Sequence, residues 1–505
     1  MVSSIRSQDL SSTWPEEQNF SQVFLSTGDL TLDSAFRIAL GDIVGNIIPF
    51  QDGLLPQPEY ALMAGLDYTT PWTRDTAINT WNGVGILYPR VTYHTLLSVL
   101  KREHETVLIG GQYWDAIIWS IGAWSQYLST GDRDFLALSF AATRDSLLFF
   151  EQQEFDTTLS LFRGPAVYGD GVAAYPDRYA QTERGSSSIL DWPASHRQDA
   201  SQPGFGLPMH TLSTNCVYYQ AYVVLEQMAT ELGLPVDPVW KQKAQQLKRA
   251  INEHFWNPAT GTYRYLVDAF GNSEEQEGMG LALALLFGVA DREQVAAILR
   301  NHHGTEQGFP CIWPPFERYS RADGQSFGRH CGVIWPHIQG LWAHAVAEQR
   351  RADLFAHELY TLAQHAYRDS QFAEIYHPLT GVIYGGLQEG HHGNTAEHLA
   401  RPSGHFLEWK SCSRQTWSAS AYLRMILMGL FGLHLAVDGI TFQPLLPPQL
   451  HKIRLSGLPY RAARLTIEVE RSAAEPASFV NGQAFEHVHL PTDIQGDVHI
   501  LLKVS

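Results

Sequence analysis

The chain has 505 residues, 52 of them acidic and 35 basic, and its formal net charge is -17. With 44% hydrophobic and 17% charged residues, the composition is typical of a protein with a large buried core and excludes a disordered chain. The acidic excess argues against nucleic acids and anionic membranes as partners, because both are bound chiefly through Lys and Arg.

The N-terminal segment is polar. Met1 to Trp14 is rich in serine and lacks the apolar stretch of a secretory signal. No run of about 18 consecutive apolar residues, as a membrane-spanning helix would need, occurs in the sequence. We therefore expect a cytoplasmic protein with no membrane partner, in which residues 1–33 form an N-terminal extension.

Helical periodicity dominates residues 34–433. The clearest helix is predicted over 111–130, where Trp114, Ile118 and Ile121 share one face and Gly131 ends the pattern. Further helices are predicted to begin near Ser34, Asp75, Arg133, Leu212, Val239, Gly278, Arg292, Cys331, Ala352 and Arg414. Many form close pairs, such as 133–154 after 111–130 and 352–370 after 331–349, and such pairs must run antiparallel. About a dozen helices in hairpins predict that residues 34–433 form an all-α domain, the (α/α)6 toroid.

Three long connections interrupt the helical pattern, at residues 152–210, 304–328 and 372–410. They are dense in Trp, Tyr, Asp and His, and loops of this length in a compact domain are usually functional. We expect them to lie at one end of the barrel and to roof a pocket. The alternative is that they merely cover the barrel end.

The last part of the chain changes to a period of two residues. Leu465, Ile467 and Val469 alternate with polar residues, and residues 499–504 have the pattern of another short strand. Residues 434–505 are therefore predicted to form a small antiparallel β module that packs on the barrel, because about 70 residues are marginal alone.

The cysteines and histidines give no sign of a metal site. Cys216, Cys311, Cys331 and Cys412 lie far apart without CxxC spacing, so buried free thiols are expected. The adjacent pairs His302-His303 and His391-His392 point apart on a helix or strand. We predict no metal and no cofactor.

The sequence motifs argue against two enzyme classes. A GxxxxGK[ST] phosphate loop is absent, which argues against phosphoryl transfer from nucleotides. Gly324 to Gly328 matches GxSxG, but a nucleophile elbow needs a buried strand directly before the serine. Here Pro314-Pro315 and a turn at 321–324 precede it, so a serine hydrolase is disfavoured.

Two acidic residues stand among aromatic residues in the long connections. Glycosidic bonds are cleaved by two carboxyl groups, one of which protonates the leaving oxygen while the other activates water or attacks the anomeric carbon. Asp170 in Tyr-Gly-Asp-Gly and Glu374 in Phe-Ala-Glu-Ile-Tyr both have an apolar neighbourhood of the kind that raises the pKa of an acid. Only a closed fold could bring them together, and a toroid does so because its loops converge on one axis.

Several segments together resemble the six-hairpin glycosidases, above all glycoside hydrolase family 63 and its clan of processing α-glucosidases, mannosylglycerate and glucosylglycerate hydrolases and trehalases. The resemblance covers about Asp67 to Leu433. It is carried by Pro71–Thr76, similar to W-x-R-D-T; by Ser326–Pro336, similar to Y-W-R-G-P-I-W-P; by Phe372–Gly381, similar to E-x-Y-N-P-x-T-G; and by Gln415–Ala419 at the start of the last helix.

Two segments depart from that pattern. His330-Cys331 stands between the Arg and the Gly of the second motif, or replaces part of it. Val167–Asp177 occupies the place of the family's E-S-G-x-D-N-S-P, so a sister family with the same barrel is an alternative to family 63 proper. Asp170 is the better match to the acid, and Asp177 is its rival.

The resemblance implies roles for individual residues. Asp170 would be the general acid and Glu374 the general base. Stacking on the sugar is implied for Trp72, Trp335 and Trp417, and hydrogen bonds to it for Arg74, Asp75 and Gln112. The remaining candidates for sugar contact are Tyr113, Asp191, Trp192, Tyr376 and Glu408. The alternatives are purely local: Arg74-Asp75 could be only a helix start, and Asp170 only a turn residue.

The resulting prediction is an exo-acting, inverting glycoside hydrolase that removes a terminal α-linked hexose, in the first place glucose, from a small glycoside or oligosaccharide. Inverting enzymes hold their carboxyl groups about 6.5–9.5 Å apart. The alternatives are a rhamnosidase-like or debranching-type hydrolase, a glycoside phosphorylase, and a non-catalytic sugar-binding toroid. The sequence does not determine the sugar, the linkage, the aglycone or the oligomeric state.

Overall fold

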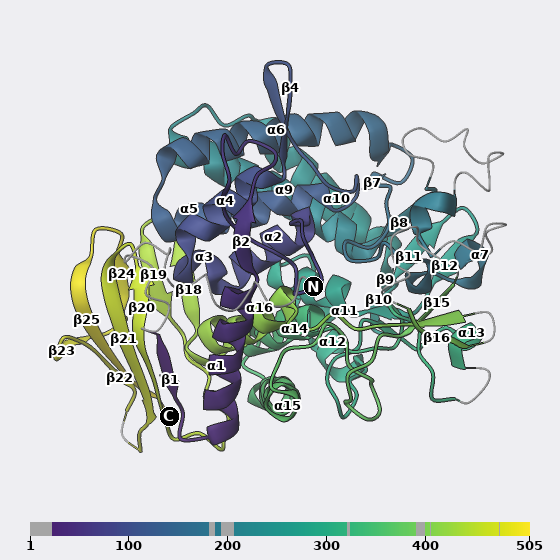
Figure 1. Ribbon diagram of the computed structural model, residues 1–505. Coiled ribbons are helices and arrows are strands. Elements are labelled where there is room, and N and C mark those ends of the chain that lie inside the picture. Colours follow the sequence, from purple (N-terminus) through teal and green to yellow (C-terminus); the bar gives the residue numbers. More distant parts are fainter. Residues whose placement is uncertain are drawn as a thin grey trace.

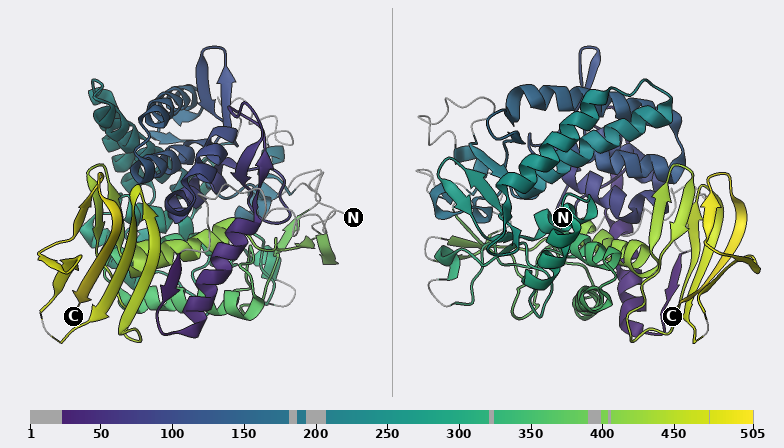
Figure 2. Two further views of the ribbon diagram at one scale, coloured as in Figure 1. Left: turned by 60° about the vertical axis from the view of Figure 1, so that its left-hand side comes forward. Right: turned by 180° about the vertical axis from the view of Figure 1, so that it is seen from behind.

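The computed structural model describes residues 23–180, 187–192, 207–320, 324–389, 399–403, 406–473 and 475–504. Helices make up most of the body, and the C-terminal strands form a layer at one side of it (Figures 1 and 2). The helices are α1 (Leu30–Gly45), α2 (Thr73–Asn79), α3 (Gly85–Leu87), α4 (Pro89–Ser98), α5 (Trp119–Thr130), α6 (Arg133–Glu154), α7 (Asp177–Ala180), α9 (Leu212–Leu232), α10 (Pro238–His254), α11 (Gly278–Leu286), α12 (Arg292–Asn301), α13 (Glu317–Ser320), α14 (Pro336–Glu348), α15 (Ala352–Asp369) and α16 (Thr416–Arg424).

The longer helices alternate along the chain between an outer and an inner position. The inner helices α2, α5, α9, α11, α14 and α16 each contact the next one, and α16 contacts α2, so that they close a ring. The outer helices α1, α4, α6, α10, α12 and α15 precede them in chain order. The predicted (α/α)6 toroid of helical hairpins is confirmed.

Side-chain patterns explain which helices lie inside. Every residue of α11 from Gly278 to Leu285 is buried, as expected for a helix that is apolar all round, whereas α10 buries only a narrow stripe. Glycines bring inner helices close together. A Cβ at Gly122 of α5 would lie 2.6 Å from the Cα of Ala77 in α2, and one at Gly340 of α14 would lie 2.7 Å from the Cβ of Ala421 in α16.

Helix boundaries agree with the expectation where periodicity and caps coincide. The helix α6 spans Arg133–Glu154 as predicted, and the side chain of Asp132 caps it. The helices predicted over 111–130 and 331–349 begin later, at Trp119 after a 3-10 turn and at Pro336. In the second case the proline stands at the first helical turn and disfavours helical backbone before it.

The C-terminal module is a mixed β structure. Its strands are β18 (Leu433–Ala436), β19 (Gly439–Phe442), β20 (Lys452–Tyr460), β21 (Ala462–Arg471), β22 (Ala477–Val480), β23 (Gln483–Phe485), β24 (His489–Pro491) and β25 (Gln495–Val504). The larger sheet has the order β1-β20-β21-β25-β22-β23, and β18-β19-β24 form a second sheet.

Two features of this module differ from the prediction. The long strands β21 and β25 run parallel, so the module is not purely antiparallel; the chain crosses over through β22 to β24 between them. The strand β1 (Phe24–Ser26), which lies within the predicted N-terminal extension, pairs with β20. Residues 24–33 are therefore part of the folded body, because α1 begins at Leu30.

Short strands complete the connections between the helices. They are β2 (Ile47–Phe50), β3 (Glu59–Leu62), β4 (Leu100–Glu103), β5 (Thr106–Ile109), β6 (Phe155–Asp156), β7 (Leu161–Phe162), β8 (Met209–Thr211), β9 (Trp256–Asn257), β10 (Thr262–Tyr263), β11 (Leu266–Asp268), β12 (Gly271–Ser273), β13 (Gln276–Glu277), β14 (Ile312–Trp313), β15 (Leu387–Glu389), β16 (Leu399–Ser403) and β17 (Phe406–Trp409). Several of them follow or precede an inner helix, where the long connections lie.

Some smaller expectations can be compared directly. All four cysteines are buried and free, as predicted. Among the described residues before the GxSxG segment at 324–328, the nearest element is the helix α13 and not the strand that a nucleophile elbow needs. Among the helices of the described ranges, none combines the length and apolar character that crossing a membrane requires.

Candidate active site

A cavity of about 550 Å³ opens where the N-terminal ends of α2, α14 and α16 meet the long connections. Eight of the predicted site residues line it: Trp72, Arg74, Asp75, Gln112, Asp170, Trp335, Glu374 and Trp417. Asp170 and Glu374 come from connections about 200 residues apart in sequence. The closed ring of inner helices brings them to one cavity.

Five predicted sugar contacts lie outside this lining, and so does the rival acid Asp177. Tyr113 packs edge-on against Trp114 with ring centroids 5.1 Å apart, and Trp192 packs on Tyr179 at 5.3 Å. Asp191 is exposed.

Tyr376 and Glu408 lie beside lining residues without belonging to the lining. Tyr376 is buried and stacks on His365 at 4.6 Å, and its hydroxyl accepts a hydrogen bond from the Ala373 amide. Glu408 precedes Trp409 on β17, and it is Trp409 that lines the cavity, because successive strand residues point to opposite faces.

Asp170 is held through both of its carboxylate oxygens. Arg74 Nη2 donates to Oδ2 at 2.9 Å, and His330 Nε2 lies 3.3 Å from Oδ1. The side chain remains 35% exposed within the cavity. Burial raises the pKa of Asp170, but the charge of Arg74 and the hydrogen bond with His330 outweigh it, so that the pKa lies below its usual range.

Glu374 is nearly enclosed, with 3% of its side chain exposed. Arg329 Nη2 donates to Oε2 at 2.8 Å, and the Cys412 amide donates to the same oxygen at 2.9 Å. The Tyr68 hydroxyl lies 3.5 Å from the other oxygen, Oε1. These donors all suit an ionised carboxylate.

Two further carboxyl groups surround Arg74. Its Nη1 donates to Asp115 at 2.9 Å, and the neighbouring Asp75 lines the cavity. Burial raises the pKa of Asp75 to about 7 although Arg74 opposes the rise, and Glu374 raises it further. Burial likewise raises the pKa of Asp115 to about 6 against the effect of Arg74. The guanidinium group of Arg74 thus stabilises the negative charge of several carboxyl groups at the edge of the cavity.

Indole rings form one wall. Trp417 stacks on His337 with centroids 4.0 Å apart, and Trp335 meets Trp417 edge-on at 5.3 Å. On the described residues the indole N–H groups of both tryptophans are buried without a hydrogen-bond partner, as are both amide atoms of Gln415 and one oxygen of Asp75. Buried polar groups are nearly always paired, so this cavity suits a ligand that carries many hydroxyl groups.

The sequence reasoning missed several lining residues, among them Tyr68, Arg329, His330, Gln388 and Gln415. Arg329 and Gln415 belong to the quoted motifs, so the motifs contained a signal for them. Gln388 comes from β15, whose path into the cavity no local pattern reveals.

The described residues include no cluster of three His, Cys, Asp or Glu side chains that could hold a metal ion. His391-His392 lies outside the described residues.

A comparison with protein-family models decides the family. The model described as the mannosylglycerate hydrolase MGH1-like glycoside hydrolase domain matches residues 116–406, more than half of the chain, and this range includes Asp170 and Glu374. The chain belongs to this family. The MGH1-like chain is therefore a glycoside hydrolase. No match was found among curated proteins.

Solved structures share the fold of this MGH1-like chain at low sequence identity. A sialidase has a TM-score of 0.62 and 13% identity over 89% of this chain and 38% of the sialidase. The GH63 mannosylglycerate hydrolase of Thermus thermophilus in complex with glucose has a TM-score of 0.54 and 14% identity, over 78% of this chain and 100% of the hydrolase. The GH78 rhamnosidase of a Bacillus species has a TM-score of 0.53 and 15% identity, over 96% of this chain and 44% of the rhamnosidase. This chain thus spans less than half of the sialidase and rhamnosidase chains.

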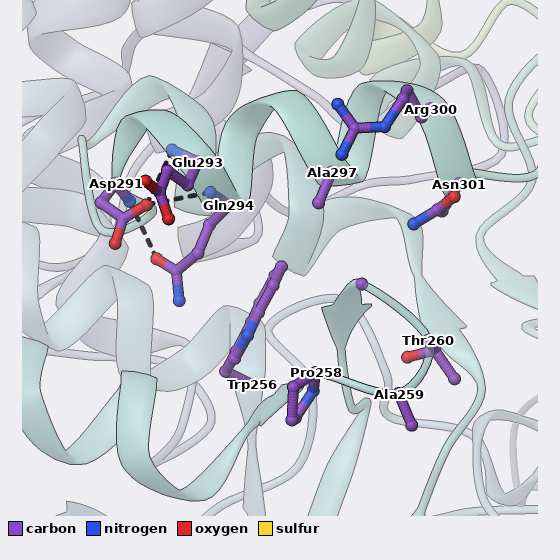
Figure 3. A pocket seen from close by; sticks show the side chains of 11 residues that line it. Trp256, Pro258, Ala259, Thr260, Asp291, Glu293, Gln294, Ala297, Arg300 and Asn301 are labelled. Carbon is purple, nitrogen blue, oxygen red and sulfur yellow. Dashed lines mark hydrogen bonds between the residues drawn. The ribbon is translucent and has the colours of Figure 1, made fainter.

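The MGH1-like chain has a second cavity, of about 540 Å³, between α12 and the connection from β9 to β10 (Figure 3). The side chain of Trp256 projects between them, while Asp291 caps α12 by accepting from the Gln294 amide. This cavity contains none of the residues that resemble the family's motifs. The cavity with Asp170 and Glu374 is therefore the candidate active site.

Proposed function

We propose that this glycoside hydrolase is exo-acting and inverting, and that it removes a terminal α-linked hexose, in the first place glucose, from a small glycoside or oligosaccharide. The observation that carries the proposal is the presence of two carboxylates, Asp170 and Glu374, on one cavity walled by indole rings. Their environments differ, as two different roles require.

Glu374 is the proposed general base. Among the described residues, Oε2 accepts from Arg329 and from the Cys412 amide, whereas the contact of Oε1 is the longer one with Tyr68. Oε1 is therefore the oxygen available to a water molecule. The water attacks the anomeric carbon and transfers its proton to Oε1.

Asp170 is the proposed general acid. The glycosidic bond breaks, its electron pair moves to the leaving oxygen, and that oxygen takes the proton of Asp170. An acid with a lowered pKa must first acquire its proton. We propose that a bound glycoside raises the pKa of Asp170 by displacing water from the 35% of its side chain that is exposed.

The choice of sugar rests on two supports. The unpaired donors and acceptors of Trp335, Trp417, Gln415 and Asp75 match a compact ring with several hydroxyl groups. A related fold, the GH63 mannosylglycerate hydrolase, holds glucose in its structure. A cavity of about 550 Å³ suits a short saccharide, because ligand pockets of roughly 300–1,000 Å³ enclose small molecules.

The test is a screen of nitrophenyl glycosides and small α-glucosides, with the released anomer followed by NMR. Inversion predicts that an α-glycoside first releases the β-anomer. Glu374→Gln should lower kcat by at least about 100-fold with the fold intact, since general catalysis contributes roughly 10²–10⁴-fold. Glu408→Gln is the matched control, because Glu408 lies outside the lining.

The outcomes separate the alternatives. Release of the α-anomer first would overturn inversion, and unchanged turnover by Glu374→Gln would remove Glu374 as the base. Turnover that requires inorganic phosphate would indicate a phosphorylase. Cleavage of rhamnosides in preference to glucosides would replace the proposed sugar.

A further inference from the structure

The two oxygens of Asp170 are not equally able to carry the acid's proton. Oδ2 accepts from Arg74, which Asp115 also holds, at 2.9 Å. An arginine does not release its proton, so it occupies this oxygen permanently. The proton of the acid form therefore belongs on Oδ1, and the group next to Oδ1 is His330, whose Nε2 lies 3.3 Å away.

The surrounding structure holds the His330 ring in this position. The backbone is fixed on both sides, because the Arg329 amide donates to Leu387 O at 2.9 Å and the Cys331 amide donates to Gly328 O at 3.0 Å. The ring is 2% exposed and lies edge-on to Trp335 at 4.8 Å.

Gly171 leaves the space that the ring uses. A Cβ at this position would overlap Gln388 Oε1 and would lie 2.6 Å from His330 Cε1, which is closer than real Cβ atoms approach. The glycine after Asp170 thus makes room for the imidazole and for the amide of Gln388.

The charge on the ring suits a hydrogen-bond donor. Burial lowers the pKa of His330, and the charges of Arg329 and Arg74 lower it further, while Asp170 raises it. The neutral ring that results carries one N–H. Placed on Nε2, this N–H points to a carboxylate at Oδ1.

We propose that His330 is a further catalytic residue, which donates its Nε2–H to Asp170 Oδ1 as that oxygen loses its proton. The inference rests on the proposed function of Asp170 as the acid. As the glycosidic bond breaks, its electron pair goes to the leaving oxygen, and the proton of Oδ1 moves to that oxygen. Negative charge then develops on Oδ1, where the Nε2–H stabilises it. His330 itself neither gains nor loses a proton.

This role has a signature that a merely structural role lacks. A poor leaving group, such as methoxide from a methyl glycoside, needs nearly complete proton transfer, whereas nitrophenolate needs little. Removal of a donor from a site of developing charge costs about 100-fold or more. We expect His330→Ala to lower kcat, which is measured from the substrate complex with its protonated Asp170, about 100-fold for the methyl glycoside and only a few-fold for the nitrophenyl glycoside. His330→Gln, which keeps an N–H donor at similar reach, should restore most of the loss.

Asp170→Asn measured on the same two substrates is the reference. If this variant discriminates between the leaving groups and His330→Ala lowers both rates equally, the inference about His330 is wrong while the acid assignment stands. If Asp170→Asn does not discriminate, the acid assignment itself fails. Should His330→Ala not fold, His330→Asn, which keeps an amide but shortens its reach, is expected to show the same discrimination, and its absence would overturn the proposal.

Discussion

Glu277 offers a test of how a buried carboxyl group makes the stability of this protein depend on pH. It is fully buried before α11, and the Ser213 amide donates to its Oε2 at 2.9 Å. Burial raises the pKa of Glu277 from 4.5 to about 8, although the hydrogen bonds with Ser213 lower it. We consider the replacement Glu277→Gln, whose neutral amide keeps an acceptor for Ser213.

The sign and size of the effect follow from linkage. A carboxyl group whose pKa is higher in the folded state contributes stability that is complete below its unfolded pKa and is lost as pH rises to the folded pKa. The window here runs from pH 4.5 to about 8. At about 1.4 kcal/mol per pH unit, the wild type should lose up to roughly 5 kcal/mol across this window from Glu277 alone. The Glu277→Gln variant has no carboxyl group at this position and should not lose this stability.

Urea denaturation followed by tryptophan fluorescence, at pH 5 and at pH 8.5, measures the difference. Subtracting the wild type from the variant at each pH removes the other titrating groups. Between the two pH values, the free energy of unfolding of Glu277→Gln should rise relative to that of the wild type by roughly 4 kcal/mol. Glu253→Gln, at an exposed position, is the control and should show no such change. An equal difference at both pH values would refute the reasoning.

Two further predictions concern the support of Glu374. Asp42, fully buried in α1, accepts hydrogen bonds from the Phe372 amide and from Arg414, both at 2.7 Å. Asp42→Ala leaves that amide unpaired and should lower the free energy of unfolding, measured by urea denaturation, by about 1–3 kcal/mol. The same variant should lower kcat more than it raises KM. An unchanged kcat would contradict the positioning. A Cβ at Gly385 would overlap the Trp409 carbonyl, so Gly385→Ala should cost about 1–3 kcal/mol. In calorimetry this corresponds to a Tm lower by about 1–3 °C for a chain of this length, and an unchanged Tm would contradict the overlap.

The control for the glycine replacement is Gly304→Ala. Among the described residues no atom lies within 4 Å of a Cβ at Gly304, so this variant should leave Tm unchanged. The comparison separates the loss of backbone freedom from steric overlap.

Local patterns alone predicted much of the helical body. The helix α6 has an aspartate cap, an amphipathic period and a defined end, and all three are properties of neighbouring residues. The alternation of hairpins also follows from short connections, which force antiparallel neighbours. The order of the quoted motifs brought Asp170, Glu374, Trp335 and Trp417 into one prediction before any contact was known.

Tertiary structure decided what depends on distant partners. The pairing of β1 with β20 joins residues about 430 apart, and the parallel pairing of β21 with β25 depends on a crossover, so neither leaves a local pattern. Tyr113 was assigned to the cavity although it is its neighbour Gln112 that lines it, since adjacent residues diverge.

The same distinction applies to the chemistry of the site. The sequence determined that two carboxyl groups stand in aromatic connections of a helical toroid. Only the closed ring brought Arg74 and His330 to Asp170, and Arg329 to Glu374, and these contacts make the two environments unlike. The reason is physical: a pKa depends on charges within a few ångströms, and those charges come from segments that only the folded chain brings together.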